Sequence, residues 1–283
     1  MPRVIVFDFD GTMTDAEREG APFRGGYLED LAALTGLPMA EIEASAARFE
    51  AEVAANPQRF GWIFNGHIVA PAIVDPYLRM MPVARRILDE AGAFMVEAER
   101  TRLLDAILYK YNYTKTHIAF RDGARELLLG LRGQEVHIVT NSHTDAVQHK
   151  LTVLGTGNDG VDSLEWLQSR VVGRARKYII DPSFDAVPEA LTLPGLSRPV
   201  LLRRKHYHDV LEGILHAAGA SWSELTVVGD IFELDLCLPA AMGATVALIT
   251  NPFTPDYERA YLASIPNGRL LTRLADAAPL VAE

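Results

Sequence analysis

The sequence predicts an α/β fold built on a doubly wound parallel β-sheet, and two observations favour this class. Four short runs are apolar throughout and rich in β-branched residues, as is typical of strands buried on both faces. Each of the last three runs follows a segment with the spacing of an amphipathic helix, so strands and helices alternate as in βα units. Such sheets carry their chemistry outside the carboxyl ends of the strands. The four runs are residues 4–7, 136–139, 225–228 and 245–249.

The helices that precede the last three strands are expected at residues 122–132, 207–218 and 235–242. The first two carry leucine, isoleucine, valine or alanine at helical spacing, and the third is rich in leucine and alanine before Gly243. Residues 155–203 are irregular, because glycine and proline interrupt them repeatedly. Two strands are possible in this segment, one formed by 171–172 with 178–180 and one by 200–202.

The segment between the first strand and the rest of the predicted sheet has a different pattern. Its apolar positions recur at helical spacing, and its longest strand-like run is Ile68-Val69. We therefore expect a core domain of residues 1–15 and 118–283, interrupted by a helical domain of residues 16–117. Helices are expected in the inserted domain at 27–37, 39–53 and 97–113.

Composition excludes several classes of protein. The 283 residues are 49% hydrophobic and 23% charged, which excludes wholesale disorder and collagen-like repeats. The net charge of −10 argues against nucleic acid as a partner, because no basic surplus is present to release counterions. Cys237 is the one cysteine, which fits a reducing compartment. No uninterrupted apolar run approaches the roughly 20 residues of a membrane span. We expect a soluble cytoplasmic protein that binds neither nucleic acid nor membrane; its oligomeric state is left open.

The strongest chemical signal lies directly after the first strand. The run here is Asp8, Phe9, Asp10, Gly11 and Thr12. Two carboxylates two residues apart point to the same side of an extended chain, so they repel each other unless a cation lies beside them. Mg²⁺ suits such hard oxygen ligands, and glycine lets the backbone turn sharply and approach a ligand closely. The alternative is an ordinary turn in which an aspartate caps the next helix.

Two further strand ends carry polar residues. Thr140, Asn141 and Ser142 follow the strand at 136–139, where a hydroxyl and adjacent amides can hold phosphate oxygens. This short run alone is equally well explained as a helix cap. Gly229 and Asp230 follow the strand at 225–228, so Asp230 can reach the same cation as the first aspartates. Glu233 and Asp235 come next, and they could support the site or stabilise the helix dipole without any ligand.

Together these motifs resemble those of the haloacid dehalogenase superfamily, over roughly residues 1–15 and 118–250. The resemblance implies a Rossmann-like core with the insertion as a helical cap that governs substrate choice. It also implies that Asp8 attacks phosphorus to form an aspartyl-phosphate and that Asp10 acts as acid and base. The remaining roles it implies are metal ligation by Asp8, Asp10 and Asp230, phosphoryl binding by Thr140, Asn141, Gly11 and Thr12, and support by Asp235 and Glu233.

A lysine is needed as well, because three carboxylates and a phosphate dianion exceed the charge of one Mg²⁺. Lys205 opens the predicted helix before the 225–228 strand and lies 25 residues before Asp230, which resembles the usual arrangement of the family. Lys177 lies 37 residues after Thr140, a better separation from that motif. We favour Lys205 and keep Lys177 as the alternate.

These residues predict a Mg²⁺-dependent phosphatase that hydrolyses a small phosphorylated metabolite. Asp10 weighs against carbon–halogen cleavage, which needs no second aspartate. A phosphomutase of the same superfamily remains an alternative, as does a non-catalytic binding protein that kept the fold. A phosphonoacetaldehyde-type hydrolase is disfavoured, because no lysine precedes Lys110 to form a Schiff base from the insertion.

Overall fold

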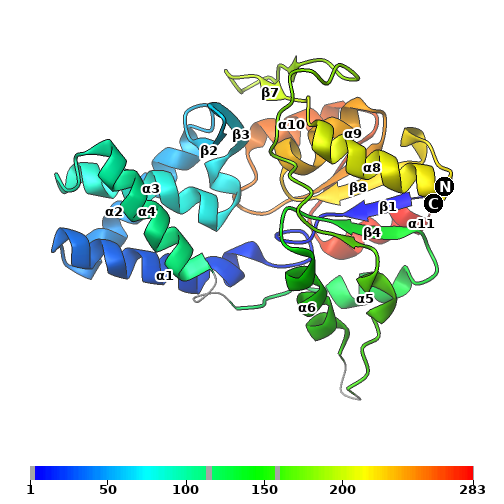
Figure 1. Ribbon diagram of the computed structural model, residues 1–283, viewed down its shortest axis with the longest axis horizontal. Helices are drawn as coiled ribbons and strands as arrows, with labels where there is room; N and C mark the ends of the chain where they lie inside the picture. Colours follow the sequence, from blue (N-terminus) through cyan, green and yellow to red (C-terminus); the bar gives the residue numbers. More distant parts are fainter. Residues whose placement is uncertain (1–3, 113–116, 157–159, 283) are drawn as a thin grey trace. The chain divides into compact units, whose positions relative to one another are not determined.

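A parallel sheet with strand order β10-β9-β8-β1-β4-β5 forms the centre of the core (Figure 1). The computed structural model describes residues 4–112, 117–156 and 160–282. The bounds of the six strands are Val4–Phe7 (β1), Val136–Val139 (β4), Val171–Val172 (β5), Leu225–Gly229 (β8), Thr245–Ile249 (β9) and Gly268–Leu271 (β10). All four strands predicted as apolar runs lie in this sheet.

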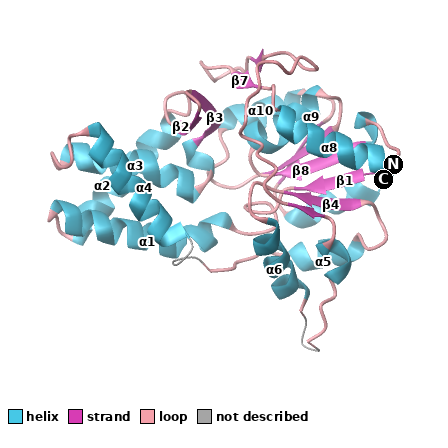
Figure 2. Ribbon diagram, viewed as in Figure 1, coloured by secondary structure: helices cyan, strands magenta, loops and turns pink. Residues whose placement is uncertain are grey.

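The strand β1 shows why the sheet is covered on both faces. Its four residues are buried, and successive side chains point to opposite faces of a strand. Val4 and Val6 pack in one apolar cluster with α8 (Lys205–Ala218), α9 (Cys237–Ala241) and α10 (Asp256–Ser264). Ile5 and Phe7 pack in a second cluster with α5 (Ala124–Gly130) and α6 (Thr144–Gly155). Figure 2 shows these helices on the two sides of the sheet. The predicted doubly wound, Rossmann-like α/β fold is therefore confirmed.

The helices of the core agree with the sequence pattern in place and differ in length. The segment predicted at 235–242 divides into a π-helical turn η3 (Phe232–Leu236) and the short helix α9, so the site residue Asp235 lies in the wide turn. The other helical bounds are α5 (Ala124–Gly130), α6 (Thr144–Gly155), α7 (Glu165–Gln168), α8 (Lys205–Ala218), η2 (Trp222–Glu224), α9 (Cys237–Ala241), α10 (Asp256–Ser264), η4 (Leu274–Ala277) and α11 (Ala278–Ala282).

The irregular segment 155–203 contributes β5 to the edge of the main sheet and forms a small antiparallel pair. The pair consists of β6 (Ala190–Leu191) and β7 (Val200–Leu201). The strand expected at 178–180 is absent from the described chain, where these residues continue the loop that follows Lys177. That loop therefore serves to present side chains rather than to extend the sheet.

The backbone divides into two compact units. Unit 1 comprises Met1–Asp15 and Phe120–Glu283, and unit 2 comprises Ala16–Ala119. The first boundary coincides with the one expected from the sequence, and the second lies two residues beyond the expected 117/118. No helix in the part of the chain that the structure describes is long and apolar enough to cross a membrane.

Unit 2 consists mainly of helices and also contains a hairpin that the sequence pattern did not reveal. Its bounds are α1 (Ala16–Thr35), α2 (Met39–Ala55), β2 (Gly61–Phe64), β3 (His67–Pro71), η1 (Ala72–Val74), α3 (Pro76–Glu90) and α4 (Glu97–Asn112). The side chain of Asp75 caps α3 by accepting hydrogen bonds from the backbone of Tyr77 and Leu78. Gly20 in α1 permits close contact with this end of α3, because a Cβ there would lie 2.6 Å from Pro76.

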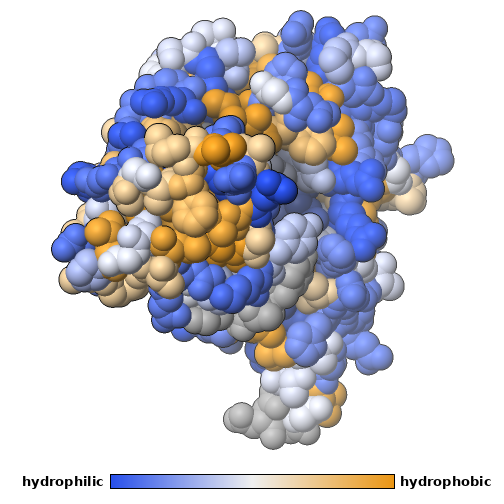
Figure 3. Space-filling view, turned by 60° about the vertical axis from the view of Figure 1, so that its left-hand side comes forward, coloured by the Kyte–Doolittle hydropathy of each residue, from blue (hydrophilic) through white to orange (hydrophobic). Residues whose placement is uncertain are grey.

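The surface of unit 2 carries apolar side chains and a cavity. In Figure 3, which brings this unit forward, apolar side chains gather into a patch bordered by hydrophilic residues. The cavity has a volume of about 630 Å³ and is lined by residues of β2, α3 and α4, Trp62 and Met81 among them.

Candidate active site

The candidate site of unit 1 lies where three neighbouring strands end. Asp8 follows β1, Thr140 follows β4 and Asp230 follows β8, and β1 lies between the other two strands. The backbone amide of Asp8 donates to the carbonyl of Val228, so the pairing of β1 with β8 continues into the site. Parallel strands thus bring together side chains that lie more than 200 residues apart in the sequence.

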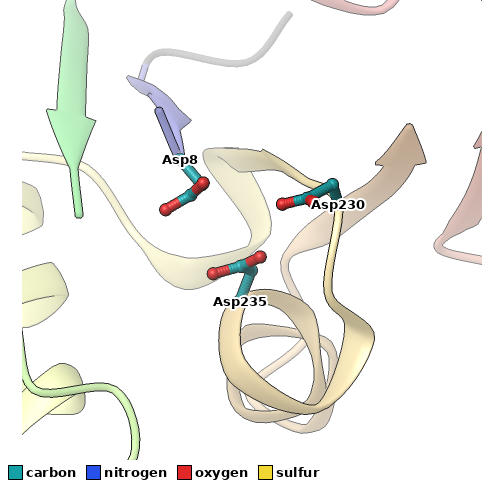
Figure 4. Close-up of side chains that lie close together, drawn as sticks. All are labelled: Asp8, Asp230 and Asp235. Carbon is teal, nitrogen blue, oxygen red and sulfur yellow. The ribbon is translucent and has the colours of Figure 1, made fainter. Parts of the chain in front are cut away.

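Three buried carboxylates form the centre of the site. Asp8, Asp230 and Asp235 each offer an oxygen atom, and these atoms lie within 4.8 Å of one another. Figure 4 shows Asp8 at the end of β1 facing the two acids that follow β8. The buried Thr12 hydroxyl lies 3.3 Å from an oxygen of Asp8 and 3.3 Å from an oxygen of Asp230. The site therefore concentrates negative charge away from water.

Glycine permits the close approach of the site backbone to these acids. Gly11 has a φ of +86°, and a Cβ at this position would lie 2.1 Å from a carboxylate oxygen of Asp230. A Cβ at Gly229 would lie 2.5 Å from the Cβ of Asp235. Larger residues at either glycine would displace an acid of the cluster.

Lys177 supplies a buried positive charge to the cluster. Its Nζ donates to Asp8 at 2.7 Å and to Asp235 at 2.8 Å, and its backbone amide donates to the side chain of Asn141 at 2.8 Å. Burial lowers the pKa of the Lys177 ammonium, but the carboxylates of Asp235 and Asp8 together raise it by a larger amount. The net shift of this pKa is therefore upward. Burial raises the pKa of Asp8 to about 7, although the ammonium of Lys177 opposes this shift. Lys177 therefore stays charged and partly offsets the cost of burying Asp8.

The preference for Lys205 over Lys177 is wrong. Lys205 begins α8 on the exposed surface, where its Nζ forms an ion pair with Asp209 at 2.5 Å, one turn along the same helix. The spacing argument failed because the loop 173–177 returns from the edge strand β5 to the ends of β4 and β1. A lysine in that loop reaches Asp8 without belonging to the helix before β8.

Asp10 lies beside the cluster, and its carboxylate is held by other residues. One oxygen accepts from the Ser142 hydroxyl at 2.6 Å and the other from Lys150 Nζ at 2.7 Å. The prediction that the Asp10 carboxylate joins Asp8 and Asp230 as a metal ligand is not matched by this geometry, in which Asp235 occupies the third place. Lys150, on α6, was missed, because a lone lysine in the helix after β4 gives only a weak sequence signal.

The side chains of the Thr140 turn organise the loop around it. The Thr140 hydroxyl is buried and accepts from the backbone amide of Ser142 at 3.1 Å. Asn141 accepts from the backbone of Lys177 and so positions the lysine. Phosphoryl binding by Thr140, Asn141, Gly11 and Thr12 stays a prediction.

Glu233 does not support the carboxylate cluster. It is fully buried and forms a bidentate ion pair with Arg198, with distances of 2.6 and 2.8 Å, and it accepts from the Tyr257 hydroxyl at 2.8 Å. Glu233 and Asp235 lie two residues apart in the helical turn η3, so their side chains point to different sides and meet different partners. Burial, and then the nearby Glu233 carboxylate, raise the pKa of Glu258 well above its usual range. Glu233 thus belongs to a buried structural network.

The donor set suits a hard divalent cation. Carboxylate oxygens are the ligands that Mg²⁺ prefers, and Asp8, Asp230 and Asp235 supply three such groups with one lysine between them. Three buried carboxylates and a single ammonium leave an excess of negative charge, which a cation would offset. The residues present therefore fit the metal that the sequence predicts.

Comparisons with known proteins agree with this geometry at the level of family. The family model of the haloacid dehalogenase-like hydrolases matches residues 2–243. A search of the curated proteins finds no match.

Solved structures with the same fold cover nearly the whole chain. A predicted phosphoglycolate phosphatase from Haemophilus somnus 129PT is 18% identical, with a TM-score of 0.52, over 98% of this chain and 97% of its own. The HAD-hydrolase YfnB from Bacillus subtilis bound to magnesium is 15% identical, with a TM-score of 0.52, over 99% of both chains. At these identities the likeness concerns the fold alone.

Proposed function

The chain belongs to the haloacid dehalogenase-like hydrolase family, and on that premise we propose that it is a Mg²⁺-dependent phosphatase acting on a small phosphorylated metabolite. The observation that carries the proposal is the contact of one buried ammonium, Lys177, with two buried carboxylates, Asp8 and Asp235. Lys177 opposes the effect of burial on the pKa of Asp8 and so favours the ionised form that a nucleophile needs.

Asp8, Asp230 and Asp235 would hold the metal ion. When bound, the cation would offset the negative charge of these carboxylates and of the phosphoryl oxygens. The side-chain carboxylate of Asp10 is not among these three, because Ser142 and Lys150 hold it.

The first step is attack by a carboxylate oxygen of Asp8 on the phosphorus atom. A bond forms between that oxygen and phosphorus, and the ester P–O bond breaks, which leaves an aspartyl-phosphate. Lys177 would stabilise the charge of the transferring group, and we expect the Thr12 hydroxyl, which lies 3.3 Å from Asp8, to contact its oxygens together with the backbone around Gly11.

Asp10 acts as the general acid in the first step and as the general base in the second. In the first step the protonated form of Asp10 gives a proton to the leaving oxygen, so the product departs as an alcohol. The ionised form that results is the one that pairs with Lys150. In the second step the ionised Asp10 takes a proton from water as the water oxygen attacks phosphorus, and the aspartyl-phosphate breaks into inorganic phosphate and Asp8. The proton returned to Asp10 restores the acid for the next cycle.

The direct test is phosphate release from p-nitrophenyl phosphate and acetyl phosphate in the presence of Mg²⁺. We expect turnover by the unchanged protein and a loss of about 10³-fold or more in Asp8→Asn, because the nucleophile is removed. Asp209→Asn is the matched control, since it makes the same change at an exposed acid on α8.

The outcomes separate the alternatives. A folded protein that turns over no ester from a broad panel would contradict the proposal and favour a binding protein. A phosphomutase would move phosphate between two positions of one sugar and release little free phosphate, which would also contradict the proposal.

A further inference from the structure

The loop 173–177 alternates buried and exposed side chains. Ala175 and Lys177 are buried, and Lys177 points to Asp8, whereas Arg174 and Arg176 are exposed. The segment that delivers the buried lysine therefore also carries two solvent-accessible arginines. Arg176 directly precedes Lys177 in the sequence, and Arg174 lies three residues before it.

This loop is fixed against the turn that follows β4. Backbone and side-chain hydrogen bonds of 2.7 to 3.1 Å tie four of its residues to the turn. The bonds run from Gly173 to Thr144, from Arg174 to Ser142, from Ala175 to Thr140 and from Lys177 to Asn141. The positions of Arg174 and Arg176 are thus set relative to the residues expected to bind the phosphoryl group.

Both exposed arginines adopt a backbone conformation that favours glycine. Their φ angles are +54° and +47°, in the left-handed region that residues with a Cβ rarely adopt. Glycine at either position would relieve this strain, yet the chain places a long cationic side chain at both. Strained backbone of this kind is concentrated at ligand-binding sites.

His143 adds a further donor next to these arginines. Arg174 Nη2 lies 3.0 Å from Nδ1 of His143, which directly follows the Thr140 turn. A guanidinium can only donate, so Nδ1 accepts and the ring hydrogen resides on Nε2. In the part of the chain that the structure describes, neither Arg174 nor Arg176 forms an ion pair with an acid.

We propose that Arg174 and Arg176, together with the neutral imidazole of His143, form a site, called here the cationic rim, that binds a second anionic group on the substrate. The group is a carboxylate or a second phosphate, either of which matches the planar donor fork of arginine. The inference rests on the proposed phosphatase function and narrows its substrate class to monoesters with a further negative charge close to the reacting phosphate.

The test compares three esters of similar size. Phosphoglycolate carries a carboxylate, ethylene glycol bisphosphate carries a second phosphate, and hydroxyethyl phosphate carries neither. The unchanged protein should show a kcat/KM for at least one of the doubly anionic esters that exceeds the value for hydroxyethyl phosphate by about tenfold or more. Whichever ester is preferred identifies the group that the cationic rim recognises.

The variant is the double substitution Arg174→Gln and Arg176→Gln. It should lower kcat/KM for the preferred ester about tenfold more than for hydroxyethyl phosphate, because the guanidinium contacts are lost. Arg269→Gln is the matched control: this exposed arginine lies on β10, at the edge of the sheet opposite β5, and the preference should persist there.

Binding to the Asp8→Asn variant separates this inference from the proposed function. Calorimetric titration with the same esters reports affinity without turnover. The cationic rim is supported if a doubly anionic ester binds more tightly than hydroxyethyl phosphate and if replacing both arginines removes this difference in affinity. This result would count even if no ester is hydrolysed. Equal affinities for all three esters, or a preference that survives the double substitution, would overturn it.

Discussion

At the scale of the residue, the site depends on charges that compensate one another away from water. Lys177 is 1% exposed, and its ammonium is tolerated there because Asp8 and Asp235 both accept from it. Lys205 has the same chemistry on an exposed helix and serves only Asp209. Burial and partners, more than residue type, therefore separate the proposed catalytic lysine from a surface lysine.

Replacing Lys177 by methionine should therefore lower phosphate release by about 10²-fold to 10³-fold, because the charge next to the nucleophile is lost. Steady-state kinetics with p-nitrophenyl phosphate measures this. Lys205→Met is the control and should retain activity within about twofold, since the pair it breaks is exposed. Lys177→Arg keeps a positive charge in the site. It therefore separates loss of this charge from unfolding as the cause of lost activity. If both methionine variants were equally active, the role given to Lys177 would be lost.

At the scale of the element, the acids that follow β1 and β8 approach each other through a turn that favours glycine. Gly11 follows β1 with a φ of +86° and lies against Asp230, so its lack of a side chain sets how near β1 and β8 can bring their acids. Gly133 has a φ of +92° in the turn before β4, yet a Cβ there would meet nothing within 4 Å. The two glycines share a backbone conformation and differ in their surroundings.

That contrast predicts different outcomes for alanine. Gly133→Ala should cost only the conformational strain, about 1 to 2 kcal/mol of the free energy of unfolding. Gly11→Ala adds a clash with the Asp230 carboxylate and should also reduce phosphate release by about 10²-fold, as expected when a ligand is displaced. Urea denaturation and steady-state kinetics measure the two effects. Full activity in Gly11→Ala would show that the acid tolerates displacement.

A second element-scale prediction concerns the start of α3. Burial raises the pKa of Asp75 to about 6 from an ordinary value of 3.8. Between these values the folded state binds more protons than the unfolded state, so the stability from this group falls as pH rises from 4 to 6. Asp75→Asn keeps a capping side chain and should flatten this fall. Urea denaturation between pH 4 and 7 measures it, with Asp105→Asn, an exposed acid of the same unit, as the charge control. An unchanged slope in Asp75→Asn would contradict the assignment.

At the scale of the whole molecule, the chain has more acidic than basic residues, and the buried carboxylate cluster gathers three of the acids in one place. The chain carries a net charge of −10, and three of its acids lie in one buried site. Folding must bring these acids together against their repulsion, with one lysine as the compensating charge. A cation that binds the folded chain should therefore stabilise it.

Added Mg²⁺ should raise the melting temperature of the full chain. At about 100 times its dissociation constant it adds about 2.7 kcal/mol to the free energy of unfolding, which corresponds to a rise of roughly 5 °C. Asp230→Asn should melt higher than the unchanged protein when EDTA is present and should lose most of the rise with Mg²⁺. Thermal melting followed by circular dichroism measures both effects, and Asp209→Asn should behave like the unchanged protein. An equal rise in Asp230→Asn would place the cation elsewhere.

Local chemistry explains what the sequence could reveal. The buried strands 4–7, 136–139 and 225–228 were recognisable because strands covered on both faces contain apolar residues at every position. Their order in βα units predicts a parallel sheet, and a parallel sheet brings the carboxyl ends of its strands together. Asp8 and Asp230 could therefore be assigned to one site before any coordinates were known. The helix pattern likewise predicted a separate inserted unit.

Tertiary structure alone decided the contacts that depend on loops and on side-chain direction. The loop that carries Lys177 and the turn of η3 that separates Asp235 from Glu233 are short segments without a regular apolar period. The ion pair of Lys150 with Asp10 depends on which way a side chain of α6 points. The β2–β3 hairpin was hidden for a related reason, since its strands are short and partly exposed. Periodicity reports which face of an element is buried, but it carries no information on where an irregular loop ends in space. For this protein the sequence determined the fold and the place where the acids meet. The tertiary structure determined which lysine contacts them, because that lysine lies on an irregular loop.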